Sequence, residues 1–386
     1  MQHKINFQPV NWADGMKINK SHFIASQHAM IDSVRDTEQH LLTPFSYGLI
    51  ASDDAYPIDI SITIDNQNFV KVKLLRCNAI SIGGARIHIE KELIEKGFVQ
   101  TAITQQISTQ ESSIFWISVS VNLFDRTPYG IPDTAESPTR IPFTLPSYQL
   151  HITADNQIKQ VLSNPNHFIV GKVLLNGSQS SVDEEYIPAC TKVSAHADLL
   201  SFHAEVDSFL GKLELKSSLI VQKILKKNQQ NELSELVMFL CDRMVLTLGQ
   251  TITHFRWITP EQSPVQMIAY TVGLARIIKN TIDLRIGSGK EELLNYLAEW
   301  CDVNQGELET LLTSIANMQY THHDINQNLI KIIKFVKVVG KLFDTLSNLE
   351  FIGKKKESNI FVKEEQMNTQ ADDINKPKPK RRFFAD

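Results

Sequence analysis

The feature that most constrains this chain is a change in the period of its apolar residues near residue 196. Before that point apolar and polar residues alternate, as in IDISITID at residues 58–65, which is the period of a half-buried strand. After it, apolar residues recur every three or four positions, which is the period of an amphipathic helix. The sequence therefore predicts an α+β chain in which a β domain precedes a helical domain.

The first domain, residues 1–195, is predicted to be an antiparallel β-sandwich. The runs ARIHIE, SIFWISVSVNLF and HFIVGKVLL are rich in β-branched and aromatic residues and are separated by turn residues. Residues 126–148 contain five prolines, and because proline cannot donate a ladder hydrogen bond we expect a long irregular loop there. One N-terminal helix is expected from the helical spacing of Phe23, Met30, Val34 and Leu41.

The second domain, residues 196–350, is predicted to be a helical bundle with a coiled-coil neck. Helix starts are expected at Ser263-Pro264 and at the capping-box sequence NQGE, residues 304–307. The last helix has the most regular pattern in the chain, with apolar residues in alternating steps of four and three. Its seam consists of Ile325, Leu329, Ile332, Val336, Val339, Phe343 and Leu346.

This seam has two interpretations. A coiled coil between chains would use it for trimerisation, since β-branched residues at the d positions disfavour parallel dimers. A buried helix of a bundle within one chain would show a similar stripe. Beyond the seam, residues 351–386 are predicted to form a flexible charged tail. The basic end of the tail could contact a partner or simply aid solubility; its residues are Lys380, Arg381, Arg382, Phe383 and Phe384.

The composition gives little sign of nucleic-acid, membrane or metal chemistry. A net charge of −4 implies no whole-protein attraction to nucleic acid. The four cysteines form no CxxC pair, which argues against a zinc site and fits a reducing compartment. The N-terminus has no apolar signal region, and the apolar runs are interrupted by polar residues, so we expect a cytoplasmic protein without direct membrane insertion.

Two groups of polar residues are candidates for chemical sites. Asp14 and His22, in NWADGMKINKSHF, could form a base with its orienting residue, but no nucleophile or phosphate-binding loop accompanies them in the sequence. His322, His323 and Asp324 could supply metal ligands, although polar residues before a helix more often cap and solvate it. We therefore predict no enzyme, no catalytic residues, no metal and no cofactor.

Two short stretches bracket the β domain in a characteristic order. The first, VNWADGMKINKSHF, and the second, DEEYIPAC, together resemble the TssK family of type VI secretion baseplate adaptors over about residues 5–350. The first stretch matches through Trp12, Asp14, Gly15, Met16, His22 and Phe23. The second matches through Asp183, Tyr186, Ile187 and Pro188, with Ala189 in place of a second proline.

The resemblance implies a non-enzymatic structural role. It implies a shoulder similar to that of phage receptor-binding proteins, a trimerising helical neck, and a head that docks the baseplate onto the membrane-complex proteins. It also implies that TssF–TssG-like wedge proteins hold the shoulder at the inner face of the cell envelope. Residues 351–386 are too few and too charged for a folded head, so we expect a divergent, Bacteroidota-type system in which the basic tail retains the docking role.

The contact made by the matched residues is left open at this point. Trp12 and Phe23 could anchor a partner, a sister subunit or their own sandwich, and Tyr186, Ile187 and Pro188 could contact a partner or form a rigid exit from the sandwich. The alternative function is a phage-type receptor-binding or fibre protein, which could share the sandwich-plus-coiled-coil plan.

Overall fold

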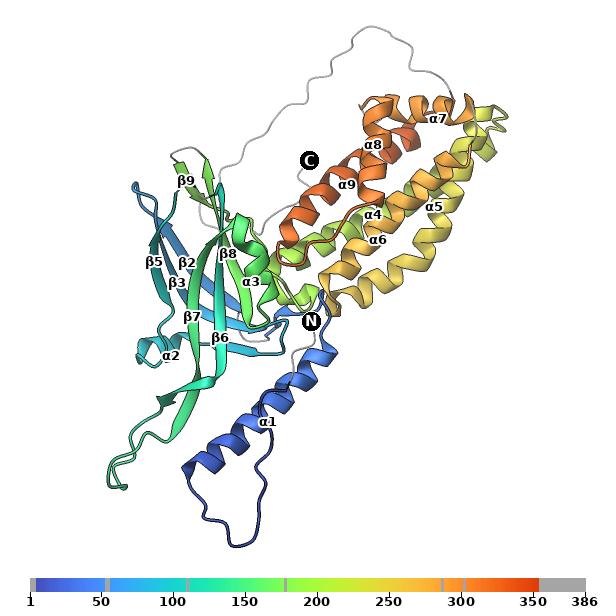
Figure 1. Ribbon diagram of the computed structural model, residues 1–386. Coiled ribbons are helices and arrows are strands. Elements are labelled where there is room, and N and C mark those ends of the chain that lie inside the picture. Colours follow the sequence, from blue (N-terminus) through green and yellow to red (C-terminus); the bar gives the residue numbers. More distant parts are fainter. Residues whose placement is uncertain are drawn as a thin grey trace, which may run out of the picture. The chain divides into compact units, whose positions relative to one another are not determined.

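The protein consists of two compact units (Figure 1). The computed structural model describes residues 5–52, 56–108, 110, 112–176, 179–285, 288–300 and 303–353. The first unit comprises Met1–His196 with Thr321–Asn326, and the second comprises Ala197–Tyr320 with Gln327–Asp386. The division lies one residue from the predicted boundary, but no local pattern in the sequence indicates that residues 321–326 return to the β unit.

The first unit contains two antiparallel sheets, which confirms the predicted fold class. One sheet has the order β1-β3-β2, with β4 and β5 also paired to β3, and the other has the order β7-β6-β8-β9. The elements are α1 (Lys20–Leu41), β1 (Gly48–Leu49), β2 (Ile58–Ile64), β3 (Phe69–Ile80), β4 (Arg86–Ile89), α2 (Lys91–Glu95), β5 (Ala102–Gln106), β6 (Ile114–Tyr129), β7 (Phe143–Ala154), α3 (Ile158–Ser163), β8 (His167–Asn176) and β9 (Gln179–Val182).

The core of this unit lies between the two sheets. On β2 every second residue is half-buried and its neighbours are exposed, as the alternating sequence predicts. The side chain of Ile62 on β2 reaches the other sheet at Gly171 on β8, where a Cβ would lie 2.9 Å from Ile62 Cδ1. Gly171 therefore lets the two layers approach closely.

The predicted proline-rich loop is shorter than expected. β6 continues to Tyr129 and β7 begins at Phe143, so both ends of the segment belong to a long hairpin in which Pro128 pairs with Thr144. The physical reason is that β7 is an edge strand, and β8 covers β6 only as far as Ser120. Along this part of the hairpin each strand has one open edge, where proline costs no ladder hydrogen bond.

The second unit is a helical bundle made of α4 (Ala197–Lys226), α5 (Glu232–Trp257), α6 (Pro264–Asp283), α7 (Ser288–Glu299), α8 (Gln305–Ala316) and most of α9 (Ile325–Asn348). α6 begins at the predicted proline. The predicted capping box is present: Asn304 Oδ1 accepts the Glu307 N–H at 2.8 Å, and the Glu307 carboxylate accepts the Asn304 N–H at 3.2 Å.

The seven seam residues of α9 are between 0 and 5% exposed in the single chain. The seam is therefore buried within its own chain, as in the interpretation of α9 as a helix of an intrachain bundle. Side chains with so little accessible surface cannot also face a sister chain without rearrangement, so any trimer would have to use other residues.

The predicted tail begins later than residue 351. Ile352 is buried and its N–H donates to Gln229 Oε1 at 2.9 Å, while the Gly353 N–H donates to the Tyr296 hydroxyl at 2.9 Å. Residues 350–353 therefore pack on the helical unit. The rest of the tail lies outside the described residues, including the predicted contact residues Lys380, Arg381, Arg382, Phe383 and Phe384.

Within the described residues, one helix, α5, is long and apolar enough to cross a membrane. Core helices meet the same criterion, and α5 contributes Val237, Leu240 and Met244 to the interior of the helical unit. The expected absence of membrane insertion stays a prediction.

Candidate interaction surface

The YIPA element belongs to the interior of the β unit. Tyr186, Ile187 and Pro188 are buried, and Asp183 lies beside them at the end of β9. The Tyr186 hydroxyl donates to the carbonyl of His323 at 2.6 Å, and the carbonyl of Ile187 accepts the N–H of Ile325 at 3.1 Å. This element thus binds the returning segment 321–326 of the same chain.

The residues considered as metal ligands have separate structural contacts in the β unit. His322 Nε2 lies 2.9 Å from the carbonyl of Tyr47, and its ring packs edge-on against the Tyr47 ring. The His323 ring packs edge-on against Trp116. Burial lowers the pKa of His322 to about 4 and also lowers the pKa of His323. Among the described residues no group of three or more His, Cys, Asp or Glu side chains is placed to hold a metal.

A buried lysine pairs with the third of these residues. Lys172 on β8 donates from Nζ to Asp324 Oδ2 at 3.0 Å, and the same nitrogen lies 3.3 Å from an Asp183 oxygen. Burial lowers the pKa of Lys172, but the two carboxylates outweigh burial and raise it overall. Sequence reasoning missed this pair, although a single lysine within the apolar run HFIVGKVLL was a usable signal.

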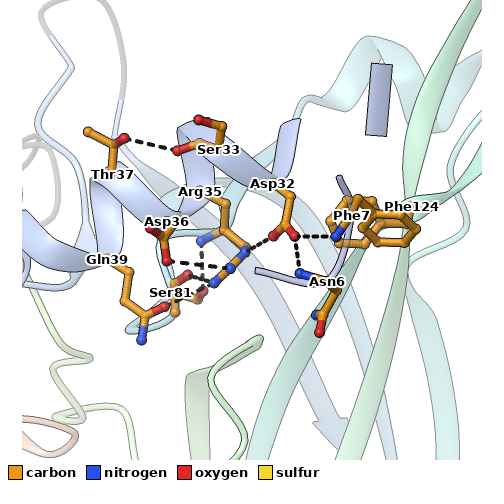
Figure 2. Close-up of polar contacts among 12 residues, drawn as sticks. Asn6, Phe7, Asp32, Ser33, Arg35, Asp36, Thr37, Gln39, Ser81 and Phe124 are labelled. Atoms are coloured by element: carbon orange, nitrogen blue, oxygen red, sulfur yellow. Dashed lines mark hydrogen bonds and ion pairs between the residues drawn. The ribbon is translucent and has the colours of Figure 1, made fainter. Parts of the chain in front are cut away.

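The N-terminal arm is fixed to α1 by one buried carboxylate (Figure 2). Asp32 Oδ2 accepts the backbone N–H groups of Asn6 at 2.6 Å and Phe7 at 3.0 Å, and Asp32 Oδ1 accepts Arg35 Nε–H at 2.8 Å. Burial raises the pKa of Asp32, but these hydrogen bonds outweigh it and hold the pKa below its usual value. The Phe7 ring packs on Phe124 of β6, with centroids 4.3 Å apart, which anchors the arm to the sheet.

Arg35 joins α1 to the turn after β3. Its Nη1 donates to the carbonyl of Gly83 at 3.3 Å and to Gln39 Oε1 at 2.9 Å. Gly84 has a φ of +77°, and a Cβ there would lie 2.3 Å from the Arg35 carbonyl oxygen. Glycine at this position of the turn therefore permits the close approach of the helix.

The polar and apolar sides of α1 are the reverse of those of an ordinary surface helix. Its buried residues are Ala29, Asp32 and Arg35. The apolar stripe faces solvent, with Phe23 62%, Met30 69%, Val34 63% and Leu41 73% exposed. A soluble helix normally turns its apolar stripe to the core, and a contiguous exposed stripe is typical of an association surface.

The matched residues of the arm lie at the N-terminal end of this stripe. Trp12 is 49% exposed, and its ring packs against His22 and Phe23 with centroids about 6 Å apart. Gly15 has a φ of +78° in a turn closed by the Met16 N–H and the Ala13 carbonyl at 3.2 Å; Asp14 occupies the same turn. Trp12 therefore packs partly on its own helix and keeps about half of its surface free.

His22 has a structural role in the start of α1. The helix begins at Lys20 and is capped by Asn19, and the Asn19 N–H donates to His22 Nδ1 at 3.3 Å. This hydrogen bond uses the nitrogen that a base would need, so the geometry gives no support to an Asp14–His22 pair.

The buried cysteines are placed for packing rather than for reactivity. Cys77, Cys190 and Cys241 are free and buried; Cys301 lies outside the described residues. Burial raises the pKa of the Cys77 and Cys241 thiols to about 12 and raises that of Cys190 as well. Since the thiolate is the reactive form, these thiols are unsuited to nucleophilic chemistry at neutral pH.

Comparisons with known proteins give structural matches only. No protein-family model and no curated protein sequence matches the chain. The chain is similar to a crystal structure of TssK, with 14% identity, 89% of this chain and 70% of that chain covered, and a TM-score of 0.49. It is similar to TssK from T6SS EAEC in complex with a nanobody, with 12% identity, 83% and 99% covered, and a TM-score of 0.45. It is also similar to a chain of the baseplate complex from the type VI secretion system, with 12% identity, 88% and 99% covered, and a TM-score of 0.49.

Proposed function

We propose that this chain is a non-enzymatic structural adaptor of a type VI secretion baseplate, which forms a homotrimer and binds wedge proteins similar to TssF and TssG. The observation that carries the proposal is the reversed amphipathic helix α1, whose exposed apolar stripe adjoins the arm with the TssK-like residues. The buried Asp32–Arg35 pair holds α1 with its apolar side toward solvent, and this orientation favours association with another protein chain.

Self-association uses the stripe of α1 in this proposal. Its positions follow alternating steps of four and three, as in a coiled-coil seam: Phe23, Gln27, Met30, Val34, Thr37 and Leu41. Two of the six are polar, which is the pattern by which seams select register and oligomeric state at some cost in stability. The stripe thus replaces the buried seam of α9 as the surface through which three copies meet.

Wedge binding uses the arm. Trp12 and Ile18 are exposed apolar side chains of the arm, and the Trp12 ring packs on Phe23. Large aromatic side chains in the centre of an interface carry most of its binding energy. Asp32 and Phe7 hold only the base of the arm. In this proposal the turn at Gly15, at the far end of the arm, forms a second contact surface for the wedge proteins. The remaining parts of the proposal are the cytoplasmic location at the inner face of the cell envelope and a membrane-side contact through the tail, with membrane-complex proteins as partners.

Affinity purification of the tagged full-length chain from its native host tests the function. Sheath, tube or wedge proteins of a contractile injection system are expected to co-purify in fixed stoichiometry. Trp12→Ala should reduce their recovery, whereas Trp257→Ala, which changes a more exposed tryptophan at the end of α5, should not. Recovery without any contractile-system protein, together with binding to glycan arrays, would favour the receptor-binding alternative instead.

A further inference from the structure

A groove of about 750 Å³ runs between α4 and α9 in the helical unit. Its floor is apolar, because Phe209 on α4 and Val336 on α9 lie largely buried beneath it. Gly340 also lines the groove, and a Cβ there would lie 3.8 Å from the Phe209 ring, so the missing side chain leaves open space above that ring. The volume falls within the range of about 300–1,000 Å³ that is usual for ligand pockets.

The groove is elongated along α9. Its lining residues on this side extend from Val336 to Leu349, which corresponds to about 20 Å at the rise of a helix. α4 and α9 run in the same direction, because Lys216 pairs with Asp344 at 3.1 Å and Lys223 Nζ donates to the carbonyl of Leu349 at 2.6 Å. A groove of this length beside two parallel helices fits the apolar side of a third helix of about 14 residues.

The rim of the groove is basic. Lys212 on α4 and Lys337 on α9 line it, are exposed, and form no ion pair with any residue that the structure describes. Lys341 also lines the rim and is exposed. Of the two carboxylates there, Asp344 already pairs with a lysine of α4, which leaves Glu205 as the other acidic side chain. The rim therefore favours an anionic partner.

The basic character continues along α9 beyond the groove. Lys331 and Lys334 precede Lys337 at intervals of three residues, and both are exposed. They line a second depression, of about 450 Å³, between α9 and α8. From Lys331 to Lys341 the helix contains no acidic residue. The fields of neighbouring lysines add, so this side of α9 attracts acidic segments and repels basic ones.

We propose that the groove binds an acidic amphipathic helix of another protein. Apolar side chains of that helix enter the groove above Phe209 and Gly340, and its carboxylates lie at the rim lysines. Grooves of this kind hold a helix through apolar residues spaced i, i+3, i+4 and i+7. An anionic membrane surface is a poorer fit, because a flat bilayer does not reach the apolar floor. The proposal does not depend on the baseplate role.

Fluorescence anisotropy with the purified full-length chain tests the proposal. The probe is a labelled helical peptide of about 14 residues with leucines on one side and glutamates on the other. It should bind, and its affinity should fall with added salt because the rim lysines are exposed. A peptide with lysine in place of each glutamate should not bind. A peptide of the same composition, with its leucines spread around the helix, should bind at least tenfold more weakly.

Variants of the groove separate the apolar contact from general attraction. Gly340→Leu leaves every charge in place but fills the space above Phe209, so it should weaken binding at least about tenfold. Gly340→Ala adds only a Cβ at ordinary contact distance and should change binding less. Lys212→Glu and Lys337→Glu should each weaken binding about threefold, the scale of an exposed ion pair. Lys71→Glu, at an exposed position of β3, should have no effect.

Three results would overturn the proposal. The first is a Kd above about 1 mM for the acidic peptide, and the second is equal affinity for the acidic and the lysine peptides. The third is binding to phosphatidylglycerol vesicles through Lys212 and Lys337 that the acidic peptide does not reduce, which would assign the lysines to a membrane surface. The lysine variants change exposed side chains only, so they keep the test decisive if Gly340→Leu does not fold. None of these measurements depends on trimerisation or on recovery of baseplate proteins.

Discussion

Asp32 and Arg35 lie one turn apart on α1, and their side chains meet at 2.8 Å on the buried side of the helix. A charged pair thus occupies the position where an apolar stripe would normally pack. Its polar contacts hold the arm on one side and the Gly83 turn on the other, and the apolar stripe is left toward solvent. The same pair therefore explains both the fixed arm and the uncovered surface.

Asp32→Asn is expected to release the base of the arm. The substitution removes the charge that Arg35 faces and weakens acceptance from two backbone N–H groups, and breaking a buried pair typically costs about 3–5 kcal/mol. Hydrogen-exchange mass spectrometry should show lost protection at Asn6 and Phe7. Ser33→Ala, at an exposed neighbouring position on α1, is the matched control and should leave protection unchanged.

Protection of the arm should also depend on pH. The pKa of Asp32 is lowered in the folded protein, so its contribution is complete above the usual pKa of about 4 and is lost as the pH falls through the lower folded value. Exchange at Asn6 and Phe7 should stay slow at pH 5. Loss of protection already between pH 7 and 5 would contradict this assignment.

Lys172→Met is expected to destabilise the β unit by about 3–5 kcal/mol, because it leaves Asp324 buried without its cation. The double variant Lys172→Met with Asp324→Asn should lose less than the sum of the two single variants, with a coupling of about 1–3 kcal/mol. Urea denaturation followed by the fluorescence of Trp116, which packs near Lys172, measures the cycle. If the free-energy change of the double variant equals the sum of the two single variants, the interaction between Lys172 and Asp324 makes no contribution to stability.

His322 should make the β unit less stable in mild acid. Its pKa is lowered from 6.5 to about 4, so the unfolded chain binds more protons between these values, and stability falls as the pH drops through that window. The loss should be about 2–3 kcal/mol between pH 7.5 and pH 4.5. The variant His322→Gln can still donate a hydrogen bond to the Tyr47 carbonyl but does not titrate. Its free energy of unfolding should therefore depend less on pH than that of the wild type. If the pH dependence is unchanged in this variant, His322 is not its cause.

The elements with a clear period could be predicted from the sequence. β2, the start of α6, the capping box of α8 and the extent of α9 all follow from local patterns that the structure confirms. The proline-rich hairpin could not be predicted from the sequence. A strand accepts Pro128 or Pro146 only where one of its edges is unpaired, and the order of the strands in the sheet decides which edges are unpaired.

The candidate surface was only partly predictable. The spacing of Phe23, Met30, Val34 and Leu41 indicated a helix with an apolar side, but it could not show that this side faces solvent. That orientation is decided by Asp32 and Arg35, whose partners lie at residues 6–7 and 83. Likewise the YIPA residues and the His322–Asp324 segment are joined by contacts across more than 130 residues, which no local pattern encodes.

The measurement that tests the central claim most directly is the mass of the full-length chain in solution, by sedimentation velocity at micromolar concentration. If the stripe of α1 is the trimer surface, the chain should sediment as a species of three times its 43.8 kDa mass. The double variant Met30→Glu with Val34→Glu should be monomeric, while Ser33→Glu, also exposed on α1 but outside the stripe, should remain trimeric. A monomeric wild-type chain, or a trimer unaffected by the double variant, would contradict the account.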